Sequence, residues 1–248
     1  MRNRNMNIYG GRDPREIPAY SIAEAAHYLR LPPSTLRSWV RGGHYRVVGG
    51  QRAFEPVITL PQSPPDSPTL LSFITLTEAH VLRAIRRDHR IALPKVREAL
   101  TYLTTQLPSE HPLVAQEFET DGLDPFITRY GQLINITKAG QLTMRQAIQA
   151  YLRRIERDPP GFPLRLYPFT RSEPIESVRT IVIDPSVSFG RPVLAGTGIV
   201  TAIIAERYRA GESIDELARD YRRSRQEIEG TIRPKAIIVF ILNDVIML

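Results

Sequence analysis

Apolar residues recur along much of this chain at intervals of three and four, which is the spacing of one face of a helix. After Ser21 they occupy positions 22, 25, 26 and 29, and after Ser213 positions 214, 217, 218 and 221. Both serines stand three residues before a glutamate, and such a pair caps the first turn of a helix. The same capping pattern predicts helix starts at Thr75, Thr143 and Ser224, and the apolar spacing predicts further helices from about Ser34, Pro94 and Val200.

Alternating and β-branched stretches predict short strands between these helices. Residues 45–54 enclose Gly49 and Gly50 and predict a two-stranded hairpin. A second hairpin around Gly131 is predicted at residues 126–130 and 133–137, and strands are predicted at residues 164–169 and 180–183. Proline-rich loops, which interrupt helices and central strands, are expected at residues 61–68, 108–125 and 158–163. The expected fold class is therefore α+β and mainly helical.

The pattern divides the chain into three regions. Residues 1–107 hold the first helices and the hairpin, and residues 108–178 form a small α+β connecting segment that ends in a polar linker at 170–178. Residues 179–248 are expected to form a β-hairpin and three helices with helix-turn-helix geometry. The apolar run after Arg233 has three open interpretations: an element that closes the core, an edge offered to a partner chain, or the product of an altered reading frame.

Composition excludes several classes of protein. The chain has 248 residues, of which 42% are hydrophobic and 24% charged, as in ordinary globular proteins. The absence of cysteine excludes disulfides, cysteine-bound zinc and thiol catalysis, and it favours the cytoplasm. The first residues lack the apolar segment of a secretory signal, and the longest apolar run, residues 236–242, is too short to cross a membrane. A cytoplasmic protein without a membrane partner is expected.

The net positive charge comes from one part of the sequence. Residues 1–107 contain 15 Lys and Arg against 8 Asp and Glu, whereas residues 108–248 contain 18 of each. The net charge of +7 therefore comes from the first region alone. A basic region beside a neutral one indicates that one domain contacts a polyanion. A generally basic protein would not show this division.

Residues 17–107 resemble the winged helix-turn-helix domain of the MerR type. The matching segments are Tyr20-Ser-Ile-Ala-Glu-Ala-Ala, Leu31-Pro-Pro-Ser-Thr-Leu-Arg-Ser-Trp-Val-Arg-Gly-Gly43, Thr75-Leu-Thr-Glu and Leu93-Pro-Lys-Val. The resemblance implies binding to duplex DNA, with residues 34–41 as the recognition helix in the major groove and residues 45–54 as the wing. The proline-rich segment after the wing departs from the family pattern.

The residues themselves support this interpretation. Leu36, Trp39 and Val40 can pack on the preceding helix, which leaves an outer face where arginine can pair with guanine and hydroxyls can reach phosphate. The candidate DNA-binding residues are Ser34, Thr35, Arg37, Ser38 and Arg41 on the helix, and Arg46, Gln51 and Arg52 on the wing. A second basic surface is expected at Arg83, Arg86, Arg87 and Arg90. The alternatives are a merely solvated basic face and, for Trp39, base stacking in place of core packing.

The sequence Asp184-Pro-Ser-Val-Ser-Phe-Gly-Arg-Pro-Val-Leu-Ala-Gly-Thr-Gly-Ile199 resembles a small domain of unknown function that occurs in VapB-like antitoxins. The family pattern reads D-P-x-[IV]-x-x-G-x-P-x-[IL]-x-G-T-R-I, and Gly198 stands where the family usually has arginine. The resemblance implies that this domain binds and silences a PIN-like ribonuclease toxin. Candidate partner-binding residues are Arg191, Gly196 and Thr197, and Arg191 could pair with carboxylates of the toxin.

The C-terminal helices favour a protein partner over DNA. Glu227 and Glu229 lie on the helix that would enter the groove, where negative charge opposes phosphate. The glycines of residues 196–198 lack the following lysine and long helix of a nucleotide site. The five histidines are scattered without the spacing of metal ligands, and no catalytic serine or cysteine motif is present. No enzyme activity, cofactor or metal is expected.

Together these features predict the antitoxin of a type II toxin–antitoxin system. It would neutralise a cognate PIN-like ribonuclease toxin by direct binding and repress its own operon by binding operator double-stranded DNA. The expected assembly is a homodimer on an inverted repeat or a larger complex with the toxin. One alternative is a stand-alone MerR-like transcriptional regulator whose C-terminal domain senses a ligand or partner. Another is a structural adaptor without DNA contact.

Overall fold

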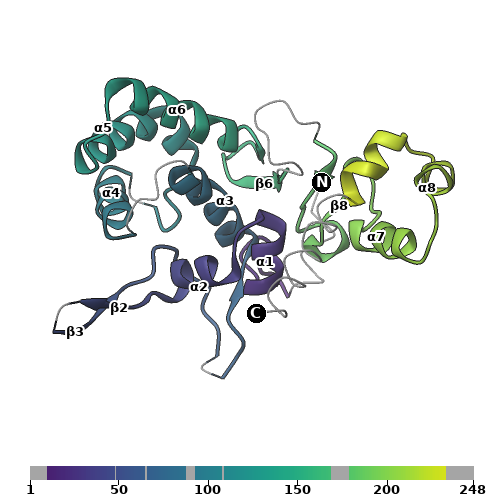
Figure 1. Cartoon of the computed structure of the whole chain (residues 1–248), viewed down its shortest axis with the longest axis horizontal. Coiled ribbons are helices and arrows are strands. Elements are labelled where there is room, and N and C mark those ends of the chain that lie inside the picture. Colours follow the sequence, from purple (N-terminus) through teal and green to yellow (C-terminus); the bar gives the residue numbers. More distant parts are fainter. Residues whose placement is uncertain are drawn as a thin grey trace. The chain divides into compact units, whose positions relative to one another are not determined.

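The computed structural model describes residues 10–47, 49–64, 66–87, 93–107, 109–168 and 179–232 (Figure 1). Helices and small two-stranded sheets make up the fold, which confirms the expected mainly helical α+β class. The chain divides into two compact units, Met1–Leu164 and Arg165–Leu248, named here the first and the second unit. The division into regions that end at residues 107, 178 and 248 stays a prediction.

The first unit begins with two short helices joined by a tight turn. The elements are β1 (Tyr20–Ser21), α1 (Ile22–Leu29) and α2 (Pro33–Arg41). The predicted capping box is confirmed: the Ser21 hydroxyl accepts from the N–H of Glu24 at 3.2 Å, and the Glu24 carboxylate accepts from the N–H of Ser21 at 2.9 Å. Arg30, with a φ of 54°, ends α1 in the left-handed conformation. This turn redirects the chain so that α2 packs against α1.

The apolar face of α2 faces the core of the first unit. Three side chains of α2 and four of α1 are buried, namely Leu36, Trp39, Val40, Ile22, Ala25, Ala26 and Leu29. Trp39 is 1% exposed, so it is a core residue and the base-stacking alternative is wrong. Its carbonyl oxygen accepts from the N–H groups of Val57 at 2.8 Å and Ile58 at 3.1 Å. These bonds fix the chain beyond the hairpin to the end of α2.

A hairpin follows α2 directly, as predicted for residues 45–54. β2 (Gly43–Val47) pairs antiparallel with β3 (Gly50–Phe54). Gly42 ends α2 with a φ of +67°, and a Cβ at this position would lie 2.3 Å from the carbonyl oxygen of Phe54. Only glycine combines that backbone angle with so close an approach. β4 (Leu70–Leu71) then pairs with β1.

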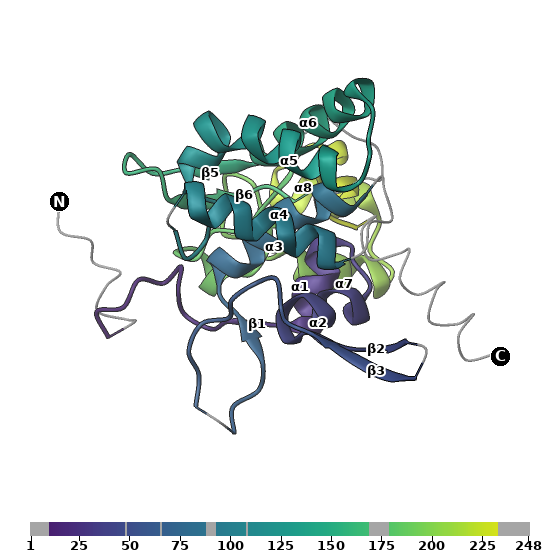
Figure 2. The ribbon, with the colours of Figure 1, turned by 90° about the vertical axis from the view of Figure 1, so that its left-hand side faces the viewer.

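Four longer helices complete most of the first unit. They are α3 (Phe73–Arg87), α4 (Leu93–Gln106), α5 (Leu123–Leu133) and α6 (Lys138–Leu152), with a π-helical turn at Phe118–Gly122 before α5. α3 contacts both α1 and α6, and α5 contacts both α4 and α6. Figure 2 shows α3 and α4 between the α5–α6 pair and the α1–α2 pair. Leu76, Leu82 and Ile85 of α3 are therefore completely buried.

The hairpin predicted at residues 126–137 is wrong, because this segment lies in α5 and in the turn into α6. Phe126 and Tyr130 are buried on one face of α5, with their rings stacked 5.4 Å apart. Gly131 is not a turn residue: it lies inside α5, and a Cβ there would lie 2.7 Å from the Gln141 side chain of α6. The chain turns instead at Asn135, whose φ is 54°. The glycine serves the close approach of two helices.

Two predicted helix starts are also wrong. α3 begins before Thr75, and Ser72 supplies the cap, since its hydroxyl accepts from the N–H of Thr75 at 3.2 Å. The cap of α6 is Thr137, whose hydroxyl accepts from the backbone N–H three residues on at 3.2 Å. Thr143 lies inside that helix. In both cases a hydroxyl upstream of the predicted box forms the cap, so the helix begins earlier.

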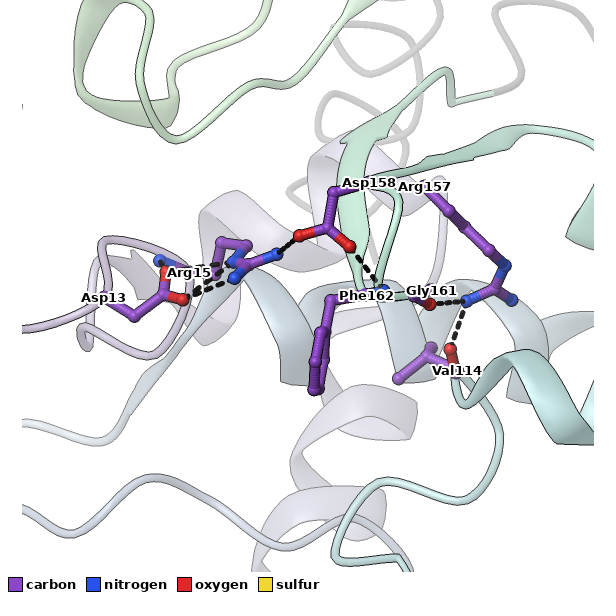
Figure 3. Close-up of polar contacts among 7 residues, drawn as sticks. All are labelled: Asp13, Arg15, Val114, Arg157, Asp158, Gly161 and Phe162. Atoms are coloured by element: carbon purple, nitrogen blue, oxygen red, sulfur yellow. Dashed lines mark hydrogen bonds and ion pairs between the residues drawn. The ribbon is translucent and has the colours of Figure 1, made fainter. Parts of the chain in front are cut away.

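An arginine ties the N-terminal segment to the turn between β5 (Ile155–Arg157) and β6 (Pro163–Leu166). Arg15 donates to both carboxylate oxygens of Asp13 at 2.9 Å and to Asp158 at 2.7 Å (Figure 3). Its guanidinium lies over the ring of Phe162, 5.4 Å from the centroid. Asp158 also accepts from the N–H of Phe162 at 2.8 Å. This network restrains both segments.

A second arginine fixes the other side of the same turn. Arg157 donates to the carbonyl oxygen of Gly161 at 3.0 Å and to that of Val114 (Figure 3). Gly161 has a φ of +91°, and a Cβ there would lie 2.2 Å from the side-chain oxygen of Gln116. The helix before this turn, α6, ends at Leu152, and β5 begins at Ile155.

A buried carboxylate of α3 holds the segment that follows α4. Glu78 is 4% exposed, and its Oε2 lies 2.9 Å from Nδ1 of His111. Burial raises the pKa of Glu78, although the hydrogen bond with His111 opposes this effect. Burial alone would lower the pKa of His111, but the hydrogen bond and charge of Glu78, with Glu110 and Glu16 nearby, outweigh it and raise that pKa. The fold therefore favours protonated His111.

The second unit contains a small sheet and three helices. β7 (Ile181–Val182) pairs antiparallel with β8 (Val193–Leu194), α7 (Thr201–Arg209) and α8 (Ile214–Tyr221) follow, and residues 225–232 are helical. The buried cluster of these helices consists of Ile204, Leu217, Ile228 and Ile232. The capping boxes predicted at Ser213 and Ser224 are confirmed. The predicted linker at 170–178 and the apolar run after Arg233 lie outside the described residues.

The segment between β7 and β8 starts at a buried aspartate. Asp184 is 3% exposed. It accepts from the N–H and the hydroxyl of Ser186 at 2.9 and 2.5 Å, and from Nε of Arg165 at 2.8 Å. Burying a polar group without hydrogen-bond partners costs free energy, and these donors remove that cost. The first half of the segment is therefore fixed by one side chain.

Replacing Asp184 by alanine is expected to lower the free energy of unfolding of the second unit by about 2 kcal/mol. Hydrogen bonds to a charged group contribute about 1.5–3 kcal/mol, and the half-exposed Arg165 adds little to them. Thermal unfolding and hydrogen exchange of the amides of residues 181–204 would measure the loss. Asp220→Ala, which removes an exposed carboxylate paired with Arg207, is the control. An equal loss in both variants would contradict the role given to Asp184.

The free energy of unfolding of the first unit is expected to fall as the pH rises above about 6.5, the ordinary pKa of histidine. Because the folded-state pKa of His111 is raised, its stabilising contribution is complete below the unfolded pKa and is lost as the pH rises through the folded value. Burial lowers the pKa of His80 to about 3, which acts in the opposite direction and below that pH range.

Urea unfolding at several pH values between about 6.5 and 8.5 measures this slope. His111→Gln, which keeps a hydrogen-bond donor but does not titrate, should remove it. A wild-type curve that is flat over this range, or an unchanged slope in the variant, would count against the contribution of His111.

Candidate nucleic-acid interface and partner-binding loop

One face of α2 is directed away from the core and carries polar and cationic residues. Ser34, Arg37 and Arg41 are exposed, and their spacing by three and four residues puts them on one side of the helix. α2 contains no acidic residue. Such a face could approach phosphates without repulsion, and its arginines could reach base edges.

The other polar residues of α2 are less accessible. Thr35 and Ser38 are half-buried. The Ser38 hydroxyl donates to the carbonyl oxygen of Thr35 at 2.7 Å, so it is engaged with its own helix. Arg41 donates through Nε to the hydroxyl of Thr69 at 3.0 Å. This bond holds Arg41 beside the segment that precedes β4.

The β2–β3 hairpin adds polar side chains next to α2. Arg46 and Gln51 are exposed and lie directly opposite each other, so they share one face of the hairpin. Arg52 lies opposite Tyr45 in the register, and its side chain is outside the described part. Figures 1 and 2 both show the hairpin projecting from the body of the first unit beside α2. Two consecutive elements of the first unit, α2 and the hairpin, therefore both carry exposed cations.

The second basic surface predicted on α3 is wrong for the two arginines whose side chains are described. Arg83 is half-buried and donates to the carbonyl oxygen of Leu29 at 2.6 Å, which supports the end of α1. The guanidinium of Arg86 lies 5.7 Å from the ring centroid of Trp39, and burial lowers the pKa of Arg86. The side chain of Arg87 and the whole of Arg90 lie outside the described residues.

Arg83 and Arg86 are partly buried because α3 lies between other helices. Because it contacts α1 on one side and α6 on another, a cation on α3 meets protein where the sequence predicted solvent. Arg83 and Arg86 thus act as supports for the exposed face of α2. Sequence analysis missed this role, and the only available signal was the unusual density of apolar residues around them, such as Leu82 and Ile85.

The segment between β8 and α7 contains the candidate partner-binding residues. Arg191 is exposed, and its Nε donates to the carbonyl oxygen of Ser188 at 3.2 Å. Thr197 is half-buried: its hydroxyl donates to the carbonyl oxygen of Leu194 at 2.7 Å and accepts from the N–H of Ile199 at 3.0 Å. Thr197 therefore shapes the turn, which limits its availability to a partner.

The two glycines of this turn have different requirements. Gly196 is exposed and has a φ of +73°, a conformation that favours glycine. Gly198, where the family pattern has arginine, has an ordinary φ, and a Cβ there would meet no atom within 4 Å. The backbone at position 198 would therefore accept an arginine directed into open space. Because this chain has glycine at position 198, no side chain projects from the surface at that position.

Two arginines in the helical part of the second unit, Arg207 and Arg225, are each paired with two carboxylates. Arg207 pairs with Glu212 at 2.5 Å and also with Asp220. Arg225 pairs with Asp215 at 2.5 Å and with Glu229 at 3.0 Å. These bonds raise the pKa of both arginines. A surface built in this way has little net attraction for phosphate.

The described residues give no indication of a metal centre or of a membrane span. No group of three or more His, Asp or Glu side chains in the described ranges is arranged to hold a metal ion. Within the same ranges, no helix combines the length and the apolar character needed to cross a bilayer.

Comparison with known proteins assigns both ends of the chain to families. Residues 18–100 match the family described as "Putative DNA-binding HTH domain", and residues 181–232 match the family described as "Protein of unknown function (DUF433)". The chain is 29% identical over 222 residues to "Putative antitoxin VapB45" of Mycobacterium tuberculosis (strain ATCC 25618 / H37Rv), covering 83% of this chain and 89% of the relative. It is 24% identical over 227 residues to the uncharacterized protein Rv2308 of the same organism, covering 88% and 89%.

The fold also resembles a solved structure. The crystal structure of Rv2018 from Mycobacterium tuberculosis has a TM-score of 0.63 with this chain, covers 87% of it and 98% of its own length, and is 23% identical in sequence. At this identity the likeness shows the fold alone. The chain thus carries an N-terminal domain of the DNA-binding helix-turn-helix family and a C-terminal DUF433 domain, and it is a distant homologue of a protein named as an antitoxin.

Proposed function

We propose that this chain is the antitoxin of a type II toxin–antitoxin system and that it also represses its own operon. The observation that carries the proposal is the combination of two domains in one chain. An exposed cationic helix face stands in the first unit, and a DUF433 domain with paired charges stands in the second. The antitoxin-named relative supports the proposal, because it aligns with 83% of this chain.

The first unit would bind DNA as a MerR-like winged helix-turn-helix domain spanning about residues 1–107. α2 would enter the major groove, with Ser34, Arg37 and Arg41 directed to bases or phosphates. Thr35 and Ser38 would contribute less, because they are half-buried. The β2–β3 hairpin would act as the wing, bringing Arg46, Gln51 and Arg52 to the backbone or the minor groove. A homodimer would read an inverted repeat upstream of the operon.

The C-terminal domain, about residues 179–248, would bind the toxin, and residues 108–178 would connect the two. The proposed toxin is a PIN-like ribonuclease, and the proposed contacts are Arg191, Gly196 and Thr197. An exposed arginine suits the acidic site of such an enzyme, because guanidinium and carboxylate form strong paired hydrogen bonds. The role proposed for the chain itself is non-catalytic binding in the cytoplasm.

Arg37→Ala is expected to weaken binding to a duplex that spans the region upstream of this gene. The expected loss is about tenfold, and the slope of log K against log salt should become less steep by about one. Gel-shift titrations at several salt concentrations measure both quantities. Lys138→Ala, which removes the same charge from an exposed site on α6, is the control and should leave both nearly unchanged. Equal behaviour of the two variants would remove α2 from the proposed interface.

Co-expression of this chain with the product of the adjacent small open reading frame is expected to give a stable complex and to relieve growth arrest caused by that product alone. Size-exclusion chromatography with light scattering measures the complex, and growth curves measure the relief. Absence of both would refute the antitoxin proposal. Retained binding to the upstream duplex would then favour a stand-alone regulator.

A further inference from the structure

The turn between β7 and β8 exposes an aromatic side chain. Phe189 is 69% exposed, more than any other exposed large hydrophobic residue in the part of the chain that the structure describes. Isolated apolar residues on a surface are common, so exposure alone decides nothing. What distinguishes Phe189 is the backbone that presents it.

Three consecutive residues in this turn have left-handed backbone conformations. The φ angles of Ser188, Phe189 and Gly190 are +49°, +56° and +73°. Glycine adopts this conformation readily, but a phenylalanine does so rarely, because its Cβ crowds the following carbonyl group. Strained backbone of this kind persists only where the surroundings hold it, and it concentrates at functional sites.

Several hydrogen bonds hold this conformation. The N–H of Gly190 donates to the carbonyl oxygen of Val187 at 3.0 Å. Both the N–H and the Nε of Arg191 donate to the carbonyl oxygen of Ser188, each at 3.2 Å. The Ser188 hydroxyl donates to the carbonyl oxygen of Gly198 at 3.1 Å. The phenyl ring is therefore presented on a braced turn, which lowers the entropy lost when a partner takes it up.

Two exposed glycines, Gly196 and Gly198, lie near this turn. Ser188 contacts the backbone of Gly198, and a Cβ at either Gly196 or Gly198 would meet nothing within 4 Å. Another chain can therefore approach the backbone closely at this point. Arg191, two residues from Phe189, is exposed and supplies a positive charge at the edge. An aromatic anchor beside an arginine is the composition typical of binding hot spots between proteins.

We propose that Phe189 is the anchoring side chain through which the DUF433 domain binds its protein partner. The ring would enter an apolar pocket of the partner, and carboxylates at the rim of that pocket would pair with Arg191. The paired charges of Arg207 and Arg225 make a protein surface a better match than nucleic acid. This inference rests on the proposed antitoxin function, since it concerns the contact between this chain and the product of the adjacent gene.

Phe189→Asn provides the test, because asparagine tolerates the left-handed conformation and lacks the ring. The melting temperature of the full chain should not fall, whereas the Kd for the product of the adjacent open reading frame should rise about 30-fold or more in calorimetric titrations. Leu142→Gln, which removes another exposed apolar side chain in the first unit, is the matched control and should change the Kd less than about threefold.

The possible outcomes distinguish failure of the anchoring role of Phe189 from failure of the antitoxin proposal. If the wild-type chain binds and Phe189→Asn binds equally tightly, the anchoring role is wrong and the antitoxin proposal stands. If the wild-type chain does not bind the adjacent gene product, both are wrong. Hydrogen exchange of the complex gives an independent readout: protection of residues 186–199 supports the anchor, and protection confined to other segments refutes it.

Discussion

The burial of Trp39 organises the first unit. Its ring faces the core between α2 and the neighbouring helices, with the guanidinium of Arg86 over it, and its carbonyl group holds the chain that leaves the hairpin. With Leu36 and Val40, Trp39 fixes the rotation of α2 about its own axis, and its carbonyl group fixes the return of the chain toward β4. The exposed face of α2 is a consequence of that rotation, because a helix can turn only one side to the core.

The exposed arginines of the α2 region and the paired arginines of the C-terminal helices differ in the interactions open to them. In the first unit, Arg37 and Arg46 are exposed on successive elements, while Arg83 and Arg86 are turned inward to support α1 and α2. In the second unit, Arg207 and Arg225 of the helical part are paired with nearby carboxylates. Exposed arginines remain available to a polyanion, whereas arginines paired with carboxylates contribute to local structure. A chain that binds two chemically different partners would benefit from this separation.

Part of the local structure could be predicted from the sequence, although the capping pattern failed at Thr75 and Thr143, and features that depend on distant neighbours could not be predicted. The caps at Ser21 and Ser213 need only the residue three positions on, and both were foreseen. Gly131 was misinterpreted because glycine serves turns and close helix contacts equally well, and only Gln141 of α6 distinguishes the two. For the candidate site, the apolar stripe of α2 correctly predicts which face of this helix is exposed. The inward direction of Arg83 and Arg86 depends on helices distant in sequence, which no local pattern encodes.

Trp39 is the only tryptophan in the chain. Because it is buried beneath the face of α2 and lies close to a guanidinium, its fluorescence reports on the packing of the first unit and on no other part of the protein. Emission that shifts when a ligand binds would locate the disturbance behind α2, and emission that stays constant while the helical signal changes would locate it elsewhere. The buried residue on which the packing of α2 depends thus also provides a fluorescence signal specific to the first unit.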